Sequence, residues 1–322
     1  MIKDIKRYAE MADPQLRPRY SGVATFFRTP LLDDAKGVDI GVVGIPFDGG
    51  VTNRTGARHG PRAVREQTTL VRRYNQATGV GPFDLVKVAD LGDAWLEQPY
   101  ELAGALDEIH AFFANVHAAG TVPLSVGGDH SVTLPVLRAL AKEGPVGMVH
   151  IDAHCDTGDD YLGSRFHHGA PFRRAVEEGL LDPKRVIQIG IRGSLNHPDM
   201  WKFSHDSGMR VVYMEEFTDK GWRWAAEEAR KVVGTGPAYL SFDVDGLDPV
   251  FAPGTGTPES GGLSMIEAQR LIRELGGLNF IGGDVVEVSP PFDPSGLTAQ
   301  NAANVLFEML CVLALAIQKR KG

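Results

Sequence analysis

The amino-acid sequence predicts an α/β protein with a mainly parallel central sheet. Short runs of β-branched residues alternate with longer helical patterns over most of the 322 residues, which is typical of strand–helix–strand units. Loops rich in glycine and proline follow several predicted strands. No internal repeat or long Pro/Ser-rich linker divides the chain. We therefore expect one domain over residues 1–322, with an N-terminal extension at about residues 1–36.

Eight apolar segments have the character of strands, and seven longer ones have helical periodicity. The predicted strands are Asp39–Ile45, Leu85–Leu91, Val122–Val126, Val146–Asp152, Arg185–Ile191, Arg210–Tyr213, Ala238–Val244 and Phe280–Val288. The predicted helices are Pro61–Tyr74, Tyr100–Ala119, Ser131–Glu143, Pro171–Leu180, Trp222–Val233, Ser264–Leu275 and Ala299–Lys319. Ligand sites of open α/β sheets form beyond the carboxyl ends of the strands. Polar residues that follow the strands are therefore the first candidates for a functional site.

Composition and charge exclude several classes of protein. With 43% hydrophobic and 23% charged residues, the chain can bury a sizeable core. Its formal net charge of -8 and the lack of any Lys/Arg run argue against nucleic-acid binding. The same balance is compatible with a small cationic substrate.

The sequence predicts a cytoplasmic protein that does not bind membranes. Met1–Pro14 lacks the apolar core of a secretory signal. Two cysteines, Cys155 and Cys311, are too few for a disulfide framework and fit a reducing compartment. The segment Ala302–Ile317 is apolar, but it is short and interrupted by polar residues, so we expect a buried or subunit-interface helix.

Acidic residues and histidines gather where three predicted strands end. His150, Asp152, His154 and Asp156 alternate after the run Val146–Val149, and residues two apart on a strand point to the same side. The chain must leave the sheet after Asp152 for all four to converge on a ligand.

Two further groups of polar residues lie at the ends of other predicted strands. Asp243 and Asp245 follow a second apolar run, and Asp129 and His130 follow a third through two glycines. Taken singly, each Asp is more often a turn or cap residue. Three such groups at three strand ends favour a shared ligand.

Divalent cations explain this clustering. Four carboxylates, those of Asp152, Asp156, Asp243 and Asp245, would repel one another and lose hydration if brought together without a cation. Two divalent ions would balance them. Carboxylate and imidazole ligands suit Mn²⁺, Zn²⁺, Ni²⁺ or Fe²⁺, and the absence of thiolates disfavours a structural zinc site. Paired metals lower the pKa of bound water, which predicts hydrolysis.

Five motifs resemble those of the arginase/agmatinase ureohydrolase family. They are Gly127-Gly-Asp-His-Ser131, His150-Ile-Asp-Ala-His-Cys-Asp156, Ser241-Phe-Asp-Val-Asp-Gly-Leu-Asp-Pro249, Gly254-Thr-Gly-Thr-Pro258 and Asp284-Val-Val-Glu-Val-Ser-Pro290. The resemblance runs in order from about Gly44 to the C-terminus. It implies a three-layer αβα sandwich, assembly as a homotrimer or homohexamer, and a site with two Mn²⁺ ions, with Ni²⁺ as an alternative.

The resemblance also implies roles for individual residues. One metal would be held by His130, Asp152, Asp156 and Asp243, and the other by His154, Asp152, Asp243 and Asp245, with Asp152 and Asp243 as bridges. His150 falls outside this ligand set and is expected as a buried or supporting histidine.

Two further residues match the family's catalytic groups. His168 matches a proton-shuttling histidine, although the sequence alone could confuse it with His167, and Glu287 matches the carboxylate that grips the guanidinium. The implied mechanism is attack of a bridging hydroxide on the guanidinium carbon. Asp245 steadies the intermediate and His168 helps the amine depart, so urea and a primary amine result.

The substrate is predicted to be a small guanidino compound, with agmatine giving putrescine as the first choice. The loop Thr157–His167 and the segments Phe251–Gly254 and Pro258–Gly262 look like the agmatinase branch. Asp159 or Asp160 could hold a distal ammonium group, or could be a solvated acidic loop.

Other substrates and other classes stay open. Arg58, Arg165 or Arg192 could instead pair with the carboxylate of guanidinobutyrate or guanidinopropionate, and free guanidine and biguanides are further alternatives. A deacetylase with one zinc ion and a non-catalytic subunit are the competing classes. One bound metal would favour the first, and two metals without guanidine hydrolysis would favour the second.

Overall fold

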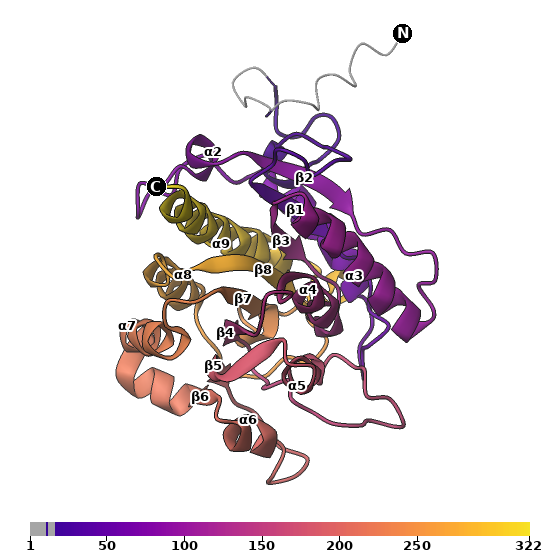
Figure 1. Cartoon of the computed structure of the whole chain (residues 1–322), viewed down its shortest axis with the longest axis vertical. Coiled ribbons are helices and arrows are strands. Elements are labelled where there is room, and N and C mark those ends of the chain that lie inside the picture. Colours follow the sequence, from indigo (N-terminus) through magenta and orange to yellow (C-terminus); the bar gives the residue numbers. More distant parts are fainter. Residues whose placement is uncertain (1–10, 12–16) are drawn as a thin grey trace.

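All eight strands of the computed structural model, which describes residue 11 and residues 17–322, form one parallel sheet (Figure 1). Residues 1–10 and 12–16 of the predicted N-terminal extension, and with them nearly all of Met1–Pro14, lie outside the described residues. The strands are β1 (Ile40–Gly44), β2 (Val88–Asp93), β3 (Val122–Val126), β4 (Val146–Ile151), β5 (Leu181–Ile191), β6 (Arg210–Tyr213), β7 (Ala238–Asp243) and β8 (Phe280–Val286). Their order across the sheet is β2-β1-β3-β8-β7-β4-β5-β6.

Helices cover both faces of the sheet and make three layers, as the family resemblance implies (Figure 1). One face carries α1 (Gly60–Thr68), α7 (Met214–Val233), α8 (Met265–Glu274) and α9 (Leu297–Lys321). The other face carries α3 (Leu102–Ala118), α4 (Thr133–Leu140) and α5 (Pro171–Glu177). Two short helices, α2 (Pro82–Leu85) and α6 (Lys202–Ser207), lie at the periphery.

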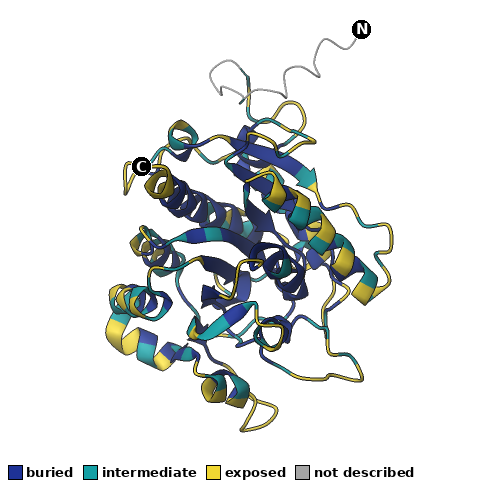
Figure 2. Ribbon diagram, viewed as in Figure 1, coloured by how far each residue is buried: buried dark blue, intermediate teal, exposed yellow. Residues whose placement is uncertain are grey.

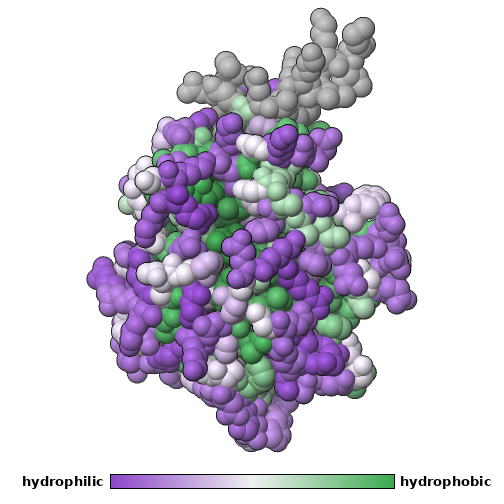
Figure 3. Space-filling model, viewed as in Figure 1, coloured by the Kyte–Doolittle hydropathy of each residue, from purple (hydrophilic) through white to green (hydrophobic). Residues whose placement is uncertain are grey.

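The apolar runs of the strands form the core. Most strand residues are buried (Figure 2), because an all-parallel sheet is covered on both faces. The face of the molecule drawn in Figure 3 is mostly hydrophilic, with smaller apolar patches. Because helices cover both faces of the sheet, its functional residues are expected at the carboxyl edge.

The C-terminal helix α9 is a core helix. It is the one helix in the described part of the chain that is long and apolar enough to cross a membrane, but 78% of its most apolar window is buried inside the protein. Glu308 interrupts its apolar surface and is only 2% exposed. Its carboxylate accepts hydrogen bonds from Arg273 at 2.5 and 3.0 Å and from Asn75 at 2.6 Å, so the buried charge is paired.

Several predicted boundaries were wrong for identifiable reasons. The helix predicted over Pro61–Tyr74 ends at Thr68, whose hydroxyl donates to the carbonyl of Arg65 and accepts from the amide of Phe27. Such side-chain bonds compete with helix continuation. The helix predicted from Trp222 begins at Met214 and is broken at Gly221, where φ is 81°.

Two short helices also escaped the sequence analysis. Leu85, expected to open a strand, instead ends α2, which begins at Pro82. The six residues of α6 were not predicted as a helix at all. Helices this short carry too few residues to show a 3.6-residue periodicity.

Candidate active site

The loop after β3 places His130 at the carboxyl edge of the sheet. Gly128 lies so close to the backbone of Phe47 that a Cβ would come within 1.5 Å of its carbonyl oxygen, so only glycine fits. Asp129 accepts hydrogen bonds from the amides of Ser131 and Gly50 at 2.8 and 2.7 Å. The double glycine of the motif therefore allows a sharp turn that buries His130 completely.

Three carboxylates converge on one nitrogen of His130. Its Nδ1 lies 2.9 Å from an oxygen of Asp156, 3.2 Å from one of Asp152 and 3.3 Å from one of Asp243. Among the described residues Nδ1 has no hydrogen-bond partner, although it is buried. Asp156 reaches the cluster because its backbone has a φ of 50° and leaves the direction of β4.

A second cluster forms around His154. Its Nδ1 lies 3.1 Å from Oδ2 of Asp245 and 3.4 Å from Oδ1 of Asp152. Asp152 thus presents Oδ2 to His130 and Oδ1 to His154. Asp243 has Oδ2 near His130, while its Oδ1 accepts the amide of Asp245 at 2.8 Å. The structure brings all six predicted ligands together in two adjoining groups.

Crowded, buried carboxylates dominate the electrostatics of both clusters. Burial and the charge of neighbouring Asp245 raise the pKa of Asp243 well above its usual range. Burial and the charge of Asp152 raise the pKa of Asp245 to about 6. Burial lowers the pKa of His130 and of His154, but the surrounding carboxylates outweigh it and raise both pKa values well above normal. Protons accumulate where a cation would otherwise compensate the charge.

A hydrogen-bonded relay behind His130 fixes its tautomer. Nε2 of His130 lies 2.8 Å from Oγ of Ser241, which donates to Asp284 at 2.7 Å. Asp284 also accepts from Thr133 and Tyr239. Because Ser241 gives its proton to Asp284, Nε2 of His130 carries a hydrogen, and the neutral ring, once the proton held by the carboxylates has left, offers the lone pair of Nδ1. An unpartnered buried lone pair facing three carboxylates fits a divalent cation.

His150 supports the site from behind. It is fully buried, and its Nδ1 lies 3.1 Å from Nε2 of Gln188. An amide nitrogen can only donate, so the ring hydrogen is on Nε2, which donates to Asp152 at 2.7 Å. His150 therefore orients a metal-ligand carboxylate, the role expected for a supporting histidine.

His168 and Glu287 lie side by side, both buried, next to the first cluster. Nδ1 of His168 lies 2.9 Å from Oε1 of Glu287, and Nε2 lies 2.7 Å from Oγ1 of Thr52. Burial opposes protonation of His168, but the charge of Glu287 raises its pKa to about 9. His167 instead points Nε2 at the carbonyl of Asp159. His168, rather than His167, thus contacts the other candidate catalytic group.

Glu287 keeps one oxygen free of hydrogen bonds. Oε1 accepts from the amide of His130 and from His168, whereas the buried Oε2 has no partner among the described residues. The backbone of Glu287 has a φ of 66°, an unfavourable region for a non-glycine residue. Strain of this kind is tolerated where function requires a side-chain direction.

A cavity of about 570 Å³ opens above these groups. Its wall includes four of the six predicted ligands (His154, Asp156, Asp243 and Asp245), the loop 158–161 and the segment 256–259. Asp159 lines it but forms ion pairs with Arg173 and Arg174 at 2.8 and 3.0 Å. Asp160 also lines it, is exposed, and accepts the amide of Gly163. Of the two acidic candidates, only Asp160 lacks a cationic partner among the described residues.

The three arginines considered for a substrate carboxylate all have other partners. Arg58 pairs with Asp48 and Arg165 with Glu177. Arg192 donates only to backbone carbonyls. Arg54, which the sequence analysis did not single out, is the one Lys or Arg side chain among the described residues that line this cavity. Its guanidinium carbon lies 5.0 Å from the centre of the Phe292 ring.

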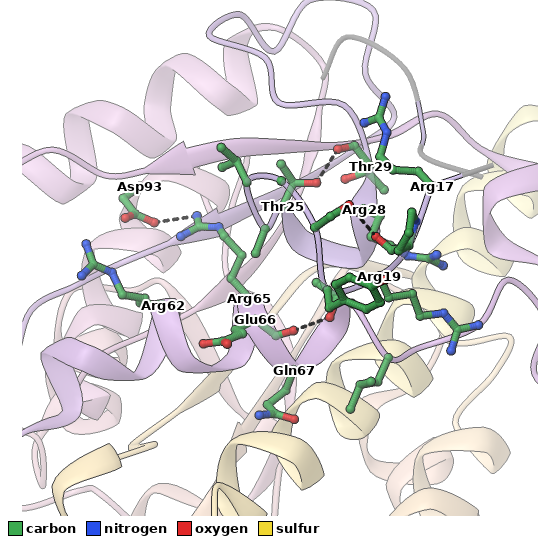
Figure 4. A pocket seen from close by; sticks show the side chains of 18 residues that line it. Arg17, Arg19, Thr25, Arg28, Thr29, Arg62, Arg65, Glu66, Gln67 and Asp93 are labelled. Carbon is green, nitrogen blue, oxygen red and sulfur yellow. Dashed lines mark hydrogen bonds and ion pairs between the residues drawn. The ribbon is translucent and has the colours of Figure 1, made fainter. Parts of the chain in front are cut away.

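A second cavity, of about 670 Å³, lies beside α1 and contains none of the predicted site residues (Figure 4). Several arginines line it, but the side chains of Arg19 and Arg62 extend to opposite sides, and Arg65 pairs with Asp93 at 2.6 Å. The guanidinium groups do not converge on one point. The cavity between the strand ends is therefore the candidate active site.

Sequence reasoning missed the residues that support this site from a distance. Thr52 comes from the loop after β1, far from His168 in the chain. Thr257 lies 3.3 Å from Oδ2 of Asp245. Ser241 offered a usable signal, since it lies two residues before Asp243 on the same face of β7. Gln188 and Arg54 lie outside the five motifs, and no sequence pattern pointed to either of them.

The fold and the site define a three-layer αβα protein with a candidate hydrolytic site, whose histidine and carboxylate clusters lie between the ends of β3, β4 and β7. A family model described as "Arginase family" matches residues 38–311. A guanidinopropionase from Pseudomonas aeruginosa is 56% identical over 298 residues, 92% of this chain and 93% of the relative. The mitochondrial agmatinase of Gallus gallus is 51% identical over 293 residues, 91% of this chain and 86% of the relative.

A solved structure agrees with these relatives. The proclavaminate amidino hydrolase of Streptomyces clavuligerus superimposes with a TM-score of 0.89 at 41% identity, covering 93% of this chain and 100% of that one. The chain belongs to the arginase family. It is an amidinohydrolase that acts on C–N bonds of guanidino compounds, and enzymes of this family use a binuclear metal centre.

Proposed function

We propose that the protein hydrolyses a short guanidino acid, such as 3-guanidinopropionate or 4-guanidinobutyrate, to urea and the corresponding amino acid. The observation that carries this choice is the charge of the cavity wall: Arg54 is its one Lys or Arg side chain among the described residues, while Asp159 is already paired with two arginines. A carboxylate at the far end of the substrate would pair with Arg54. Relatives named guanidinopropionase and guanidinobutyrase support the same choice.

Gly256, which lines the cavity, leaves space beside Glu287. A Cβ built on Gly256 would come 3.2 Å from the main-chain carbonyl oxygen of Arg54 and 3.7 Å from Oε2 of Glu287. The unpartnered Oε2 accepts N–H groups of the guanidinium. The bare glycine leaves room beside Oε2 for the methylene chain of the substrate.

The metal ligands, His168 and Glu287 each have a role in the proposed hydrolysis. Two divalent cations held by the six ligands would supply water of lowered pKa. The water oxygen becomes the carbonyl oxygen of urea, and the bond between the guanidinium carbon and the substrate's chain nitrogen breaks. His168 carries a proton at Nε2, which faces Thr52 rather than Glu287, and delivers it to the departing nitrogen. Glu287 holds the guanidinium plane during this transfer.

Agmatine remains a second candidate substrate. Its ammonium group would need an acidic partner at the rim, and Asp160 and Glu259 line the cavity there. Neither has an ion pair among the described residues. The relative named agmatinase supports this alternative.

Further properties are proposed on the same basis. Imidazole and carboxylate ligands without thiolate favour Mn²⁺, with Ni²⁺ as the alternative. We also propose a cytoplasmic homotrimer or homohexamer that binds neither nucleic acid nor membranes. Metal analysis of the purified protein and its mass in solution would test the metal and the assembly.

A urea-release assay over 3-guanidinopropionate, 4-guanidinobutyrate and agmatine tests the substrate. We expect the acids to have the higher kcat/KM, and R54Q to lower kcat/KM for them by about 10- to 100-fold, since charge-assisted pairs contribute about 1.5–3 kcal/mol. The control R165Q removes an exposed arginine that already pairs with Glu177. Faster hydrolysis of agmatine, unaffected by R54Q, would reject the guanidino-acid proposal.

A further inference from the structure

The side chain of Arg192 is saturated by backbone carbonyl groups. It is buried, with 8% of its surface exposed, and a guanidinium has five N–H donors in a rigid plane. Nη2 donates to the carbonyls of Asp245, Leu247 and Glu259 at 2.7, 3.1 and 2.6 Å. No donor is left for a substrate, and Arg192 does not line the cavity above the clusters.

The remaining donors complete a clamp between three segments. Nη1 donates to Gly190 and Gly246 at 3.1 and 3.3 Å, and Nε donates to Glu259 and Ser260 at 3.2 Å each. The acceptors come from the end of β5, the turn 245–247 and the segment 259–260. One side chain therefore ties the turn after β7 to the segment that continues the cavity wall.

Glycines near Arg192 allow the backbone conformations and close contacts that this position requires. Gly190 and Gly193 both have positive φ, 105° and 86°, which residues with a Cβ rarely adopt. A Cβ at Gly190 would come 2.8 Å from the carbonyl oxygen of Asp152, and one at Gly262 would come 2.4 Å from Nη2 of Arg192. The amide of Arg192 also donates to the carbonyl of Ala153 at 2.9 Å. Both strand ends that carry second-cluster ligands thus contact this residue.

We infer that Arg192 is a positioning residue. It fixes the orientation of Asp245, and with it the geometry of the metal site shared by His154 and Asp245. The carbonyl of Asp245 is fixed by Arg192, while its side chain reaches Nδ1 of His154 at 3.1 Å. Clamping the main chain of Asp245 fixes the direction of its carboxylate. The first cluster, around His130, receives no such contact from Arg192. Loss of the clamp should therefore loosen one metal site and spare the other.

The variant R192K keeps the charge but supplies three donors in place of the planar fork. We expect the affinity of the second Mn²⁺ to fall by about 10- to 100-fold, the usual effect of removing a residue that orients metal ligands, while the first Mn²⁺ binds as in the wild type. Titration calorimetry with Mn²⁺ gives the two affinities. Electron paramagnetic resonance then reports whether the bound Mn²⁺ is a coupled pair or a single ion.

The variant R185K is the matched control. Arg185 lies on the same strand, β5, and donates to the backbone carbonyls of Val233 and Pro237 at 2.9 and 3.0 Å, away from the clusters. We expect it to keep both Mn²⁺ affinities. Wild-type affinity at both sites of R192K, equal weakening of both sites, or the same loss in R185K would overturn the inference.

A measurement on the wild type covers the case in which R192K fails to fold. The inference requires that Arg192, and not the metals, holds the turn 245–247 and the segment 259–260. Amide hydrogen exchange of peptides spanning residues 245–263 should therefore stay protected after the metals are removed with a chelator. Loss of protection in these peptides on chelation would show that the metals hold the turn, and would overturn the inference.

Discussion

His168 and Glu287, 119 residues apart in the chain, share a buried contact of 2.9 Å between Nδ1 and Oε1. The contact orients Glu287 so that Oε2 has no hydrogen-bond partner within the described part of the chain, and it directs Nε2 of His168 towards Thr52. One pair thus prepares both an acceptor for a guanidinium and a donor for a departing amine.

The first prediction concerns the charge of Glu287. E287Q keeps the size of the side chain and the same backbone φ but removes the negative charge, so kcat/KM for the guanidino substrate should fall by about 10- to 100-fold, as expected for a charge-assisted hydrogen bond. Metal content measured on the same sample is the control and should remain that of the wild type. Unchanged kcat/KM in E287Q would contradict the role of Oε2 in substrate binding.

The second prediction concerns the relay behind His130. S241A removes the link between His130 and Asp284, so the metal at the first cluster should bind about 10- to 100-fold more weakly. T133V is the control, because it removes a different donor to Asp284 and leaves the link to His130 intact. Calorimetric titration with Mn²⁺ measures both variants, and equal affinities in S241A and T133V would contradict the relay.

The third prediction concerns pH in the metal-free protein. Burial and Asp152 raise the pKa of Asp245 to about 6 in the fold, whereas the unfolded chain has about 3.9. Between these values only the folded state holds the proton. The contribution of Asp245 to the free energy of unfolding is therefore largest below about pH 4 and is lost as the pH rises through about 6.

Metal binding must displace the same proton. Apparent Mn²⁺ affinity should therefore increase as the pH rises to about 6, and further above it, since the raised pKa values of His130 and His154 act in the same direction. Titration calorimetry over this range in two buffers of different ionisation enthalpy gives the protons released. D160N, which alters an exposed acid, should show the same slope, and a flat pH profile in the wild type would contradict the prediction.

The fourth prediction concerns the buried ion pair of α9. R273M leaves the carboxylate of Glu308 without its main partner, and removing one member of a buried pair costs about 3–5 kcal/mol of unfolding free energy. The double variant R273M/E308M should recover most of that loss. K321M is the control, since Lys321 of the same helix pairs with Asp39, the residue before β1, in a partly exposed ion pair that is expected to contribute less than about 1 kcal/mol. Urea denaturation measures all three, and similar losses in R273M and K321M would contradict the argument.

Sequence alone identified the residues at the strand ends because the chemistry there is local. Asp152 and Asp243 lie at the ends of apolar strands, and His130 follows another strand after Gly127, Gly128 and Asp129, so the place of each at the carboxyl edge follows from the strand that precedes it. The lengths of α1 and α7 were harder to predict from the sequence, because they depend on the hydrogen bonds of Thr68 and the conformation of Gly221.

The charges available to the substrate could not be predicted in the same way. Asp159 is neutralised by Arg173 and Arg174 on α5, a pairing set by how a loop folds back onto a helix. From the sequence, Arg192 was a candidate partner for a substrate carboxylate, but in the structure its donors bind backbone carbonyls. Such pairings depend on tertiary contacts, which neither periodicity nor motif spacing encodes.

The order of the strands also has a consequence for how the enzyme forms during synthesis. β8 lies between β3 and β7, and its register joins Val126 to Val285 and Asp243 to Val286. The half of the sheet containing β1 to β3 can therefore join the other half only after residues 280–286 have emerged from the ribosome. Contacts of such long sequence separation form slowly. A nascent chain should accordingly acquire its metal ions late, when β8 brings the His130 loop beside Asp152 and Asp243.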